Sequence, residues 1–256
     1  MCQLFDSSVL LIIIGIVAGI LGSLVGIGGG IIMSPALAFL GLPPSQVAST
    51  SLIAVSSTSV SSTLAYARLK KIQYSIGLKL ATFSGPGAIS GALISVGISP
   101  LHFRLLFVIL LLATGLYLLF RNSVLKECRF DSEPVWIKVL FYFGAFVAGL
   151  ISSLFGIGGG IIFVPLLVII IRMNMSSAVP TSQLALMSTA LVGTITHIII
   201  GNPEYIYALL LSIGSFVGAQ IGAKISTRFK DSTLRYIFAL LLMAVSIRFI
   251  LGVFIE

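Results

Sequence analysis

Long apolar runs, separated by short polar segments, cover almost the whole chain. A helix crosses a bilayer core of ~30 Å with about 20 apolar residues. Most runs have about this length and carry no charge at their centres, so the pattern predicts an all-α polytopic membrane protein. The runs lie at residues 8–41, 46–67, 74–98, 101–120, 137–171, 178–200, 205–227 and 233–255, with a polar segment at 121–136.

Two of these runs, 8–41 and 137–171, are too long for one comfortable span and short for two. Contiguous glycines interrupt each of them, at Gly26–Gly30 in the first and at Gly156–Gly160 in the second. Because glycine weakens a helix interior and tolerates unusual dihedral angles, we expect a broken helix at both places. The freed backbone groups must be shielded by protein or face a wet cavity. The two breaks are therefore the best candidates for the working site.

The breaks belong to an internal duplication. Gly26 recurs as Gly156, 130 positions later, and Thr50 recurs as Thr181, 131 positions later. Internal repeats are a common transporter architecture in which the substrate binds at the interface between the repeats. The duplication predicts a first membrane repeat at 1–122, a polar cytoplasmic linker at 123–136 and a second membrane repeat at 137–256.

The basic loops indicate how the two repeats are oriented. Lys and Arg gather in loops 68–71, 121–138 and 224–235, whereas loops 41–46 and 200–204 carry none. If each broken segment crossed once, the third basic loop would face away from the other two. If each segment is re-entrant or crosses twice, all three lie on one side, which the positive-inside rule makes cytoplasmic. We therefore predict two inverted repeats, each with a Gly-broken segment plus three transmembrane helices, and both termini outside.

Composition narrows the class further. The chain is 58% hydrophobic and only 9% charged, whereas about a quarter of a soluble domain is charged. The net charge of +8 reflects basic residues in short loops, which indicates topology rather than a nucleic-acid partner. Cys2 and Cys128 have no metal-ligand spacing, and no Walker motif or nucleophile–base set occurs. We expect no metal, no cofactor and no enzymatic activity.

The breaks also suggest an anion site. A helix that restarts after three glycines offers unpaired N–H groups and the positive end of its dipole. Two inverted copies would aim two such ends at one point near mid-membrane, where no Lys or Arg is predicted. Downstream hydroxyls and an amide would add hydrogen-bond donors. The candidate substrate-binding residues are Gly28, Gly29, Gly30, Thr50, Ser51, Ser57, Thr58, Gly158, Gly159, Gly160, Thr181, Ser182, Gln183, Ser188 and Thr189.

Plainer interpretations exist for several of these positions. Gly15, Gly19 and Gly22 have helical spacing, which is typical of close helix packing. A Ser or Thr in a membrane helix often bonds a carbonyl of its own helix. We interpret His197 as a hydrogen-bonded interfacial histidine rather than a proton relay.

Taken together, the doubled Gly-x-Gly-Gly-Gly segment, the proline after each copy, the downstream Thr-Ser pair and the basic linker resemble the sulfite exporter TauE/SafE family. The resemblance covers almost the whole chain. It implies a secondary transporter of small sulfur-containing anions, such as sulfite or sulfonates, that works by alternating access in the cell membrane. A passive anion channel and a membrane subunit of a larger complex remain alternatives. The sequence leaves the substrate, direction, coupling ion and homo-oligomeric state open.

Overall fold

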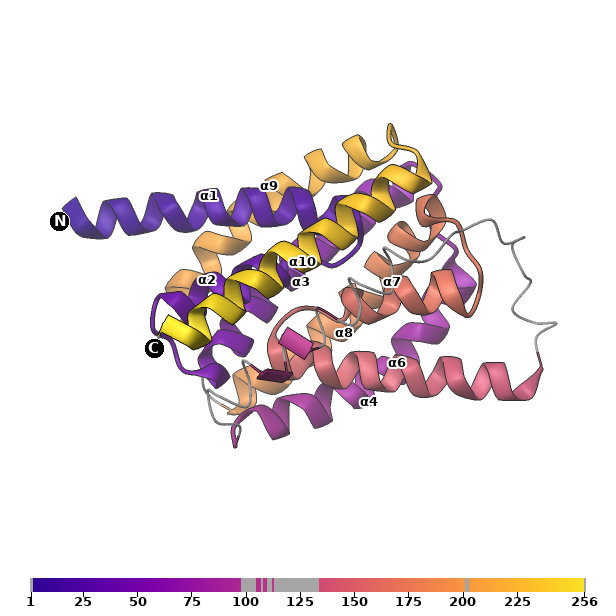
Figure 1. The fold of residues 1–256 in the computed structure, drawn as a ribbon, viewed down its shortest axis with the longest axis horizontal. Helices are drawn as coiled ribbons and strands as arrows, with labels where there is room; N and C mark the ends of the chain where they lie inside the picture. The colour runs from indigo at the N-terminus through magenta and orange to yellow at the C-terminus, as the bar shows by residue number, and fades with distance from the viewer. Residues whose placement is uncertain are drawn as a thin grey trace.

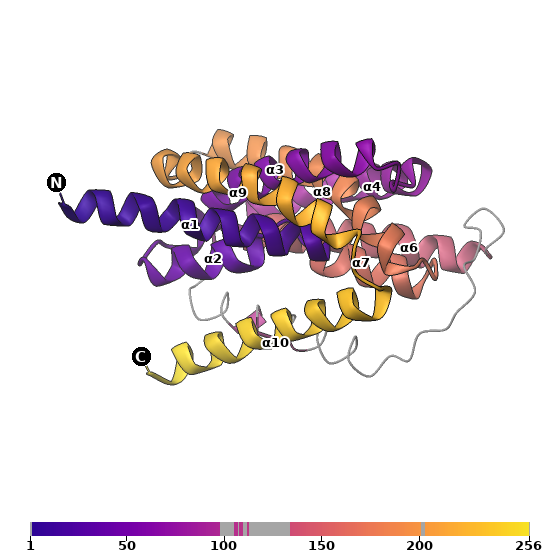
Figure 2. The same ribbon diagram turned by 90° about the horizontal axis from the view of Figure 1, so that it is seen from above.

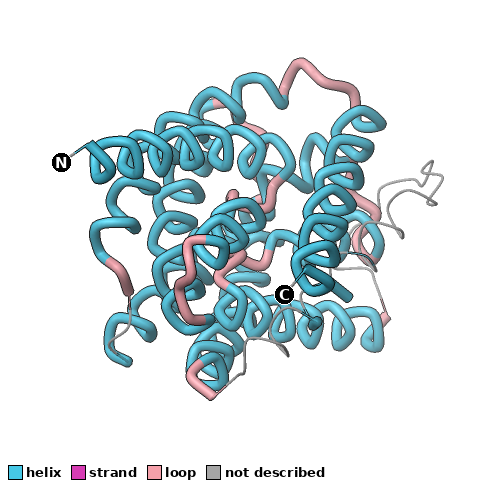
Figure 3. Tube along the Cα trace, turned by 60° about the vertical axis from the view of Figure 1, so that its left-hand side comes forward, coloured by secondary structure: helices cyan, strands magenta, loops and turns pink. Residues whose placement is uncertain are grey.

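The structure is a computed structural model that describes residues 2–97, 105–106, 108–109, 112, 134–200 and 203–255. In this part of the chain the regular elements are all helices, joined by short loops (Figure 3). The predicted all-α architecture is therefore confirmed there. Most of the predicted span 101–120, and the linker 123–136 as far as residue 133, lie outside the described residues.

The helices follow the predicted apolar runs closely, and Figure 1 labels them in chain order. They are α1 (Cys2–Val25), α2 (Gly30–Phe39), α3 (Pro44–Arg68), α4 (Tyr74–Ser95), α6 (Val135–Phe155), α7 (Gly160–Ile169), α8 (Met175–Ile200), α9 (Tyr205–Ser226) and α10 (Asp231–Ile255).

Both predicted helix breaks are present. The first long run divides into α1 and α2, and the second divides into α6 and α7. Gly26, Gly28 and Gly29 have φ values between +81° and +87°, and the matching glycines of the second break have values between +71° and +93°. Only glycine adopts this left-handed region without a steric cost, so the glycines themselves end α1 and α6.

Four helices of the described chain are long and apolar enough to cross a membrane, namely α1 from Ser8, α6, α8 and α9. The helices after the breaks are shorter, since α2 and α7 have 10 residues each. At 1.5 Å per residue such a helix reaches about 15 Å, roughly half of a bilayer core. Each broken run therefore pairs a long helix with a half-length one.

Helix α3 is rich in Ser and Thr and is mostly buried. Its hydroxyls bond backbone carbonyls of the neighbouring helix α9: Ser57 donates to Ser212 O at 3.0 Å, and Ser61 donates to Phe216 O at 2.7 Å. Polar groups in a membrane must find partners inside the protein. Helices α8 and α9, with a smaller contribution from α2, provide the cover that makes this polar helix compatible with a membrane.

Helices of the two halves pack mainly against each other. Helix α1 packs most extensively on α9, and its counterpart α6 packs on α4 (Figures 1 and 2). Small residues allow this approach: a Cβ added at Gly15 would lie 2.6 Å from Leu211 O, and one added at Gly19 would collide with Ser215 O. The expectation that these two glycines serve close helix packing is confirmed.

The same contacts give the helix directions. Gly15 faces Leu211 and Gly19 faces Ser215, so α1 and α9 run parallel. The hydrogen bonds from Ser57 to Ser212 and from Ser61 to Phe216 show that α3 and α9 are also parallel. Since α1 and α3 share a direction, α2 between them must bring the chain back, and it lies beside α1 in Figure 2. The chain therefore reverses its direction within the first broken segment.

Candidate functional site

The two glycine breaks lie directly against each other. A Cβ added at Gly30 would lie 2.5 Å from Gly156 O and 2.6 Å from the Cα of Ile157. A Cβ added at Gly160 would collide with Gly26 O in the same way. Only glycine permits this backbone approach. The fold therefore brings together two segments that lie 130 positions apart in the sequence.

Two equivalent serines hold these segments in place. Ser51 donates its hydroxyl hydrogen bond to Gly156 O at 2.8 Å, and Ser182 donates to Gly26 O at 3.0 Å. Ser34 adds a third bond to Gly156 O at 3.2 Å. Each carbonyl belongs to the residue that directly follows α6 or α1, where the helical ladder ends. The serines therefore satisfy acceptors that the breaks leave free, and each serine does so across the two halves.

The helices that restart after the breaks present backbone donors. In α2 the first helical bonds come from Ile32 and Met33, both to Gly29 O, at 3.0 and 3.2 Å. The N–H groups of Gly30 and Ile31 precede this ladder. The equivalent residues of α7 repeat the arrangement. A helix end of this kind carries about half a positive elementary charge and attracts anions.

Three buried polar atoms near the breaks have no hydrogen-bond partner in the described part of the chain: Ser152 Oγ, Ser153 Oγ and Gln183 Oε1. Ser152 lies next to the start of α7, since its Cβ is 3.1 Å from the position of a Cβ added at Gly159. The amide nitrogen of Gln183 donates to Gly22 O at 2.9 Å. Ser152 is thus a free hydroxyl donor beside a helix N-terminus.

The side chains between the breaks are apolar. Gly28 and Gly158 both face Val55 and Leu186, which are fully buried and lie 131 positions apart. A Cβ added at Gly28 would be 2.9 Å from Leu186 Cδ2, and one added at Gly158 would be 2.5 Å from Val55 Cγ1. The side chains of Val55 and Leu186 therefore both lie against Gly28 and Gly158.

Thr50 and Thr181 hold the starts of two helices. Thr50 Oγ1 accepts a hydrogen bond from the N–H of Glu204 at 3.0 Å, and Thr181 Oγ1 accepts one from the N–H of Gln73 at 3.1 Å. Glu204 and Gln73 are the N-cap residues of α9 and α4. Both predicted hydroxyls therefore serve the ends of spans and are paired with backbone donors.

The remaining predicted hydroxyls have other partners. Ser57 bonds α9, as described above, and Thr58 donates to a carbonyl of its own helix at 2.9 Å. Thr189 bonds a carbonyl of α8 at 2.9 Å and a hydroxyl of α4 at 2.6 Å. Ser188 is half-buried on α8. The hydrogen bonds of the first three run within or between helices and do not reach the breaks.

Tyr66 and His197 form a further equivalent pair, which was not predicted from the sequence. The Tyr66 hydroxyl donates to Ser23 O at 2.9 Å, and His197 Nε2 lies 3.0 Å from Ser153 O. Both side chains are buried, and His197 is hydrogen-bonded as expected. The 131-position offset links Tyr66 to His197 and could have identified the pair.

The comparisons with known proteins agree with this architecture. The model of the family described as "Sulfite exporter TauE/SafE" matches residues 11–249. The chain belongs to this family. The "probable membrane transporter protein YunE" of Bacillus subtilis is 31% identical over 266 residues, covering 95% of this chain and 97% of that protein. The "probable membrane transporter protein MJ0441" of Methanocaldococcus jannaschii is 32% identical, covering 96% and 94%. No solved structure matches.

This TauE/SafE protein is therefore a multi-pass membrane transporter and not an enzyme. Its family implies a small substrate and a lipid bilayer as its surroundings. The resemblance inferred from the doubled glycine segment is confirmed.

Proposed function

We propose that this TauE/SafE protein is a secondary transporter of small sulfur-containing anions, such as sulfite or a sulfonate, and that it works by alternating access between two inverted repeats. The observation that carries the proposal is the contact between the two glycine breaks. This contact gathers the donor-bearing starts of α2 and α7 into one region. The family description supplies the sulfur-containing class of substrate.

The helix directions support inversion of the repeats. Gln73 contacts Thr181 and Ser84 contacts Thr189, so α4 and α8 run parallel. Helix α4 follows α3 across a short connection and runs back against it. Helix α8 therefore runs opposite to α3, although the 131-position offset makes these two helices counterparts. Counterparts of opposite direction are what inverted repeats require.

The charge distribution favours reversible binding. The described side chains that face the breaks are apolar or carry hydroxyl or amide groups. A full charge in a low-dielectric interior would hold an anion too tightly for turnover, because Coulomb attraction grows several-fold as water is excluded. Two helix ends, each worth about half an elementary charge, bind less tightly. We assign the anion to these ends, with the free Ser152 hydroxyl as an additional donor.

The symmetric serine bonds suggest how access alternates. One bond, from Ser51 to Gly156 O, secures one side of the contact, and the bond from Ser182 to Gly26 O secures the other. Opening one bond while the other persists would part Val55 from Leu186 on one side only. The unbroken side would then prevent a continuous pore.

Flux into proteoliposomes tests this proposal. The purified chain is reconstituted and uptake of radiolabelled sulfite is measured with and without unlabelled sulfite inside. We expect saturable uptake, stimulation by internal sulfite, and competition by sulfonates but not by acetate. A large non-saturating current would indicate a channel instead. Uptake of sulfite and sulfonates no faster than into empty liposomes would contradict the substrate assignment.

A further inference from the structure

The side-chain amide of Gln183 lies directly at the first glycine break. Its Nε2 donates to Gly22 O at 2.9 Å, and the N–H of Gly28 donates to the same oxygen at 3.1 Å. Gly22 also contacts the N-cap residue of α2, since a Cβ added there would collide with the backbone nitrogen of Gly29. One residue of α1 therefore brings the Gln183 amide next to the start of α2.

The amide presents its oxygen without a partner. Gly22 O can only accept hydrogen bonds, so the amide nitrogen, and not the amide oxygen, must face it. Gln183 Oε1 therefore faces away from Gly22. It is buried and has no hydrogen-bond partner in the described part of the chain. A buried acceptor of this kind is energetically unfavourable until a donor from the protein, a water or a ligand pairs with it.

The internal duplication indicates that packing alone does not require an amide at this position. Gln183 follows Ser182, which bonds the first break, and Leu52 follows Ser51, which bonds the second. Leu52 and Gln183 are thus counterparts, 131 positions apart, and both are fully buried. An apolar side chain fills the place at the second break that an amide fills at the first. The two breaks therefore differ in chemistry, although their backbones are alike.

An acceptor beside a helix N-terminus makes a site sensitive to whether an anion carries a hydrogen. The N–H groups of Gly30 and Ile31 precede the α2 ladder and attract the oxygens of an oxyanion. Gln183 Oε1 carries a partial negative charge, so it repels a bare anionic oxygen but accepts a hydrogen bond from an O–H or N–H group. A ligand without such a hydrogen leaves the acceptor unpaired and is disfavoured.

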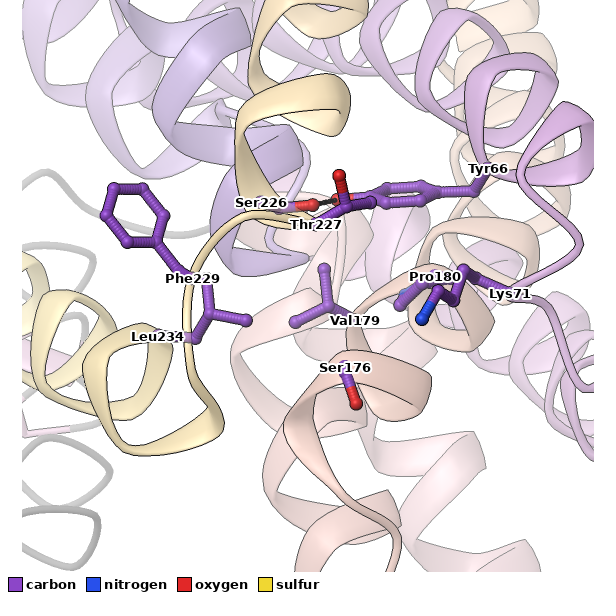
Figure 4. A pocket seen from close by; sticks show the side chains of 9 residues that line it. All are labelled: Tyr66, Lys71, Ser176, Val179, Pro180, Ser226, Thr227, Phe229 and Leu234. Atoms are coloured by element: carbon purple, nitrogen blue, oxygen red, sulfur yellow. Dashed lines mark hydrogen bonds between the residues drawn. The ribbon is translucent and has the colours of Figure 1, made fainter.

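Packed side chains surround the amide. Tyr66 and Val179 line a small surface cavity (Figure 4). The Tyr66 hydroxyl donates to Ser23 O at 2.9 Å, on the residue that follows Gly22. Val179 lies one helical turn before Gln183 on α8. Because Gln183 is fully buried, an anion that reaches its amide has lost most of its water, and the hydrogen of the anion needs an acceptor within the protein.

We propose that the first glycine break binds a small oxyanion that carries a hydrogen, such as hydrogensulfite, and that Gln183 Oε1 accepts this hydrogen. The start of α2 holds the anionic oxygens, and Gln183 is the specificity-determining residue. The identification of this anion as the transported substrate rests on the proposed function, whereas the preference for a hydrogen-bearing anion does not.

Two nearly isosteric anions test the proposal. Sulfamate carries an amino group where methanesulfonate carries a methyl group, and the sulfonate oxygens and the charge are the same. In isothermal titration calorimetry of the purified full-length chain, we expect sulfamate to bind about fivefold more tightly, as one additional hydrogen bond provides. Gln183→Leu, which introduces the residue found at the second break, should make the two dissociation constants about equal.

Gln220→Leu is the matched control and should keep the preference for sulfamate. The Gln220 amide also donates to a backbone carbonyl, Ser61 O at 3.0 Å, but it joins α9 to α3 rather than α8 to a break. Gln183→Leu should still fold, because Gly22 O keeps its backbone donors from the break, and the melting temperature without anion checks this. Gln183→Met, which keeps the length of the side chain, provides a second variant with the same expected result.

Equal binding of the two anions by the unchanged chain, binding of neither, or an undiminished preference after Gln183→Leu or Gln183→Met would overturn the inference. Sulfite flux measured on the same preparations tests the transport function separately. Sulfite uptake without a sulfamate preference would leave the proposed function standing and remove only the role of Gln183. A sulfamate preference that Gln183→Leu abolishes, without sulfite uptake, would keep that role and contradict only the transport of sulfite.

Discussion

Hydroxyl groups beside the glycine breaks divide into two kinds. Ser51 and Ser182 donate to carbonyls of the opposite break, so their removal leaves a buried acceptor unpaired. Ser152 is buried but has no partner in the described structure, so its removal costs no hydrogen bond within the protein. Stability and substrate binding should therefore respond in opposite ways to the two kinds of substitution.

We expect Ser152→Ala to raise the half-saturation concentration for sulfite about fivefold, equivalent to ~1 kcal/mol for one lost hydrogen bond. The melting temperature in detergent without substrate should stay unchanged. Ser51→Ala should lower that melting temperature, because Gly156 O loses a donor. Flux and thermal unfolding measured on both variants check this, and a reversed pattern would remove Ser152 from the site.

Gly29 should tolerate no side chain. Its φ is +81°, and an added Cβ would lie 2.7 Å from Ala18 O. We expect Gly29→Ala to destabilise the protein by more than ~1 kcal/mol, the usual cost of left-handed backbone for a non-glycine residue. Gly85→Ala is the matched control, because a Cβ there meets nothing within 4 Å and alanine favours a helix interior. Equal melting temperatures for the two variants would show that the break is not constrained.

The helix breaks at the glycines could be predicted from the sequence, but the roles of the individual hydroxyl groups could not. Contiguous glycines have a local consequence, a broken helix, which can be predicted from the residue type alone. The partner of Ser51 lies 105 positions away, and that of Ser182 lies 156 away. A hydroxyl binds a carbonyl or an anion according to its tertiary neighbours, and a single sequence does not contain them.

The starts of α9 and α4 are each held by a hydrogen bond to a threonine hydroxyl. Because Thr50 and Thr181 accept the N–H groups of Glu204 and Gln73, each secures the start of a helix in the other half. We expect Thr181→Val to leave one N–H unpaired and to cost ~1 kcal/mol of stability, with or without substrate. Thr82→Val provides a control, since Thr82 is exposed and bonds its own helix. A higher half-saturation concentration without a loss of stability would instead support direct contact between Thr181 and the anion.

Helix positions were predictable and helix partners were not. The apolar runs gave α3, α4, α8, α9 and α10 to within a few residues, because length and hydropathy are local properties. The packing of α1 on α9 could not be predicted. A membrane helix is apolar on most faces, so its hydrophobic periodicity does not identify the helix it packs against. Glycine spacing indicated that α1 approaches some helix closely, but not which one.

The interlocking of the two halves has a consequence for the whole molecule. Since α1 packs mainly on α9, and α6 mainly on α4, neither half holds its own partners. We expect residues 1–122 expressed alone to be degraded or to aggregate. Co-expression of 1–122 with 123–256 should restore a folded complex that purifies through a tag on either fragment. A stable monomeric half would contradict this interdependence.

The orientation of the whole molecule connects its charge and its helix directions. The basic turns after α3 and α9 lie at corresponding ends of two parallel helices, so they share one face. The positive-inside rule predicts that this face is cytoplasmic. In a chain with Cys2 and Cys128 replaced by Ser, an impermeant maleimide should label Tyr205→Cys in intact cells, because Tyr205 is exposed at the opposite end of α9. Lys70→Cys should react only after permeabilisation. The reverse result would place the basic turns outside the cell and would contradict the predicted orientation.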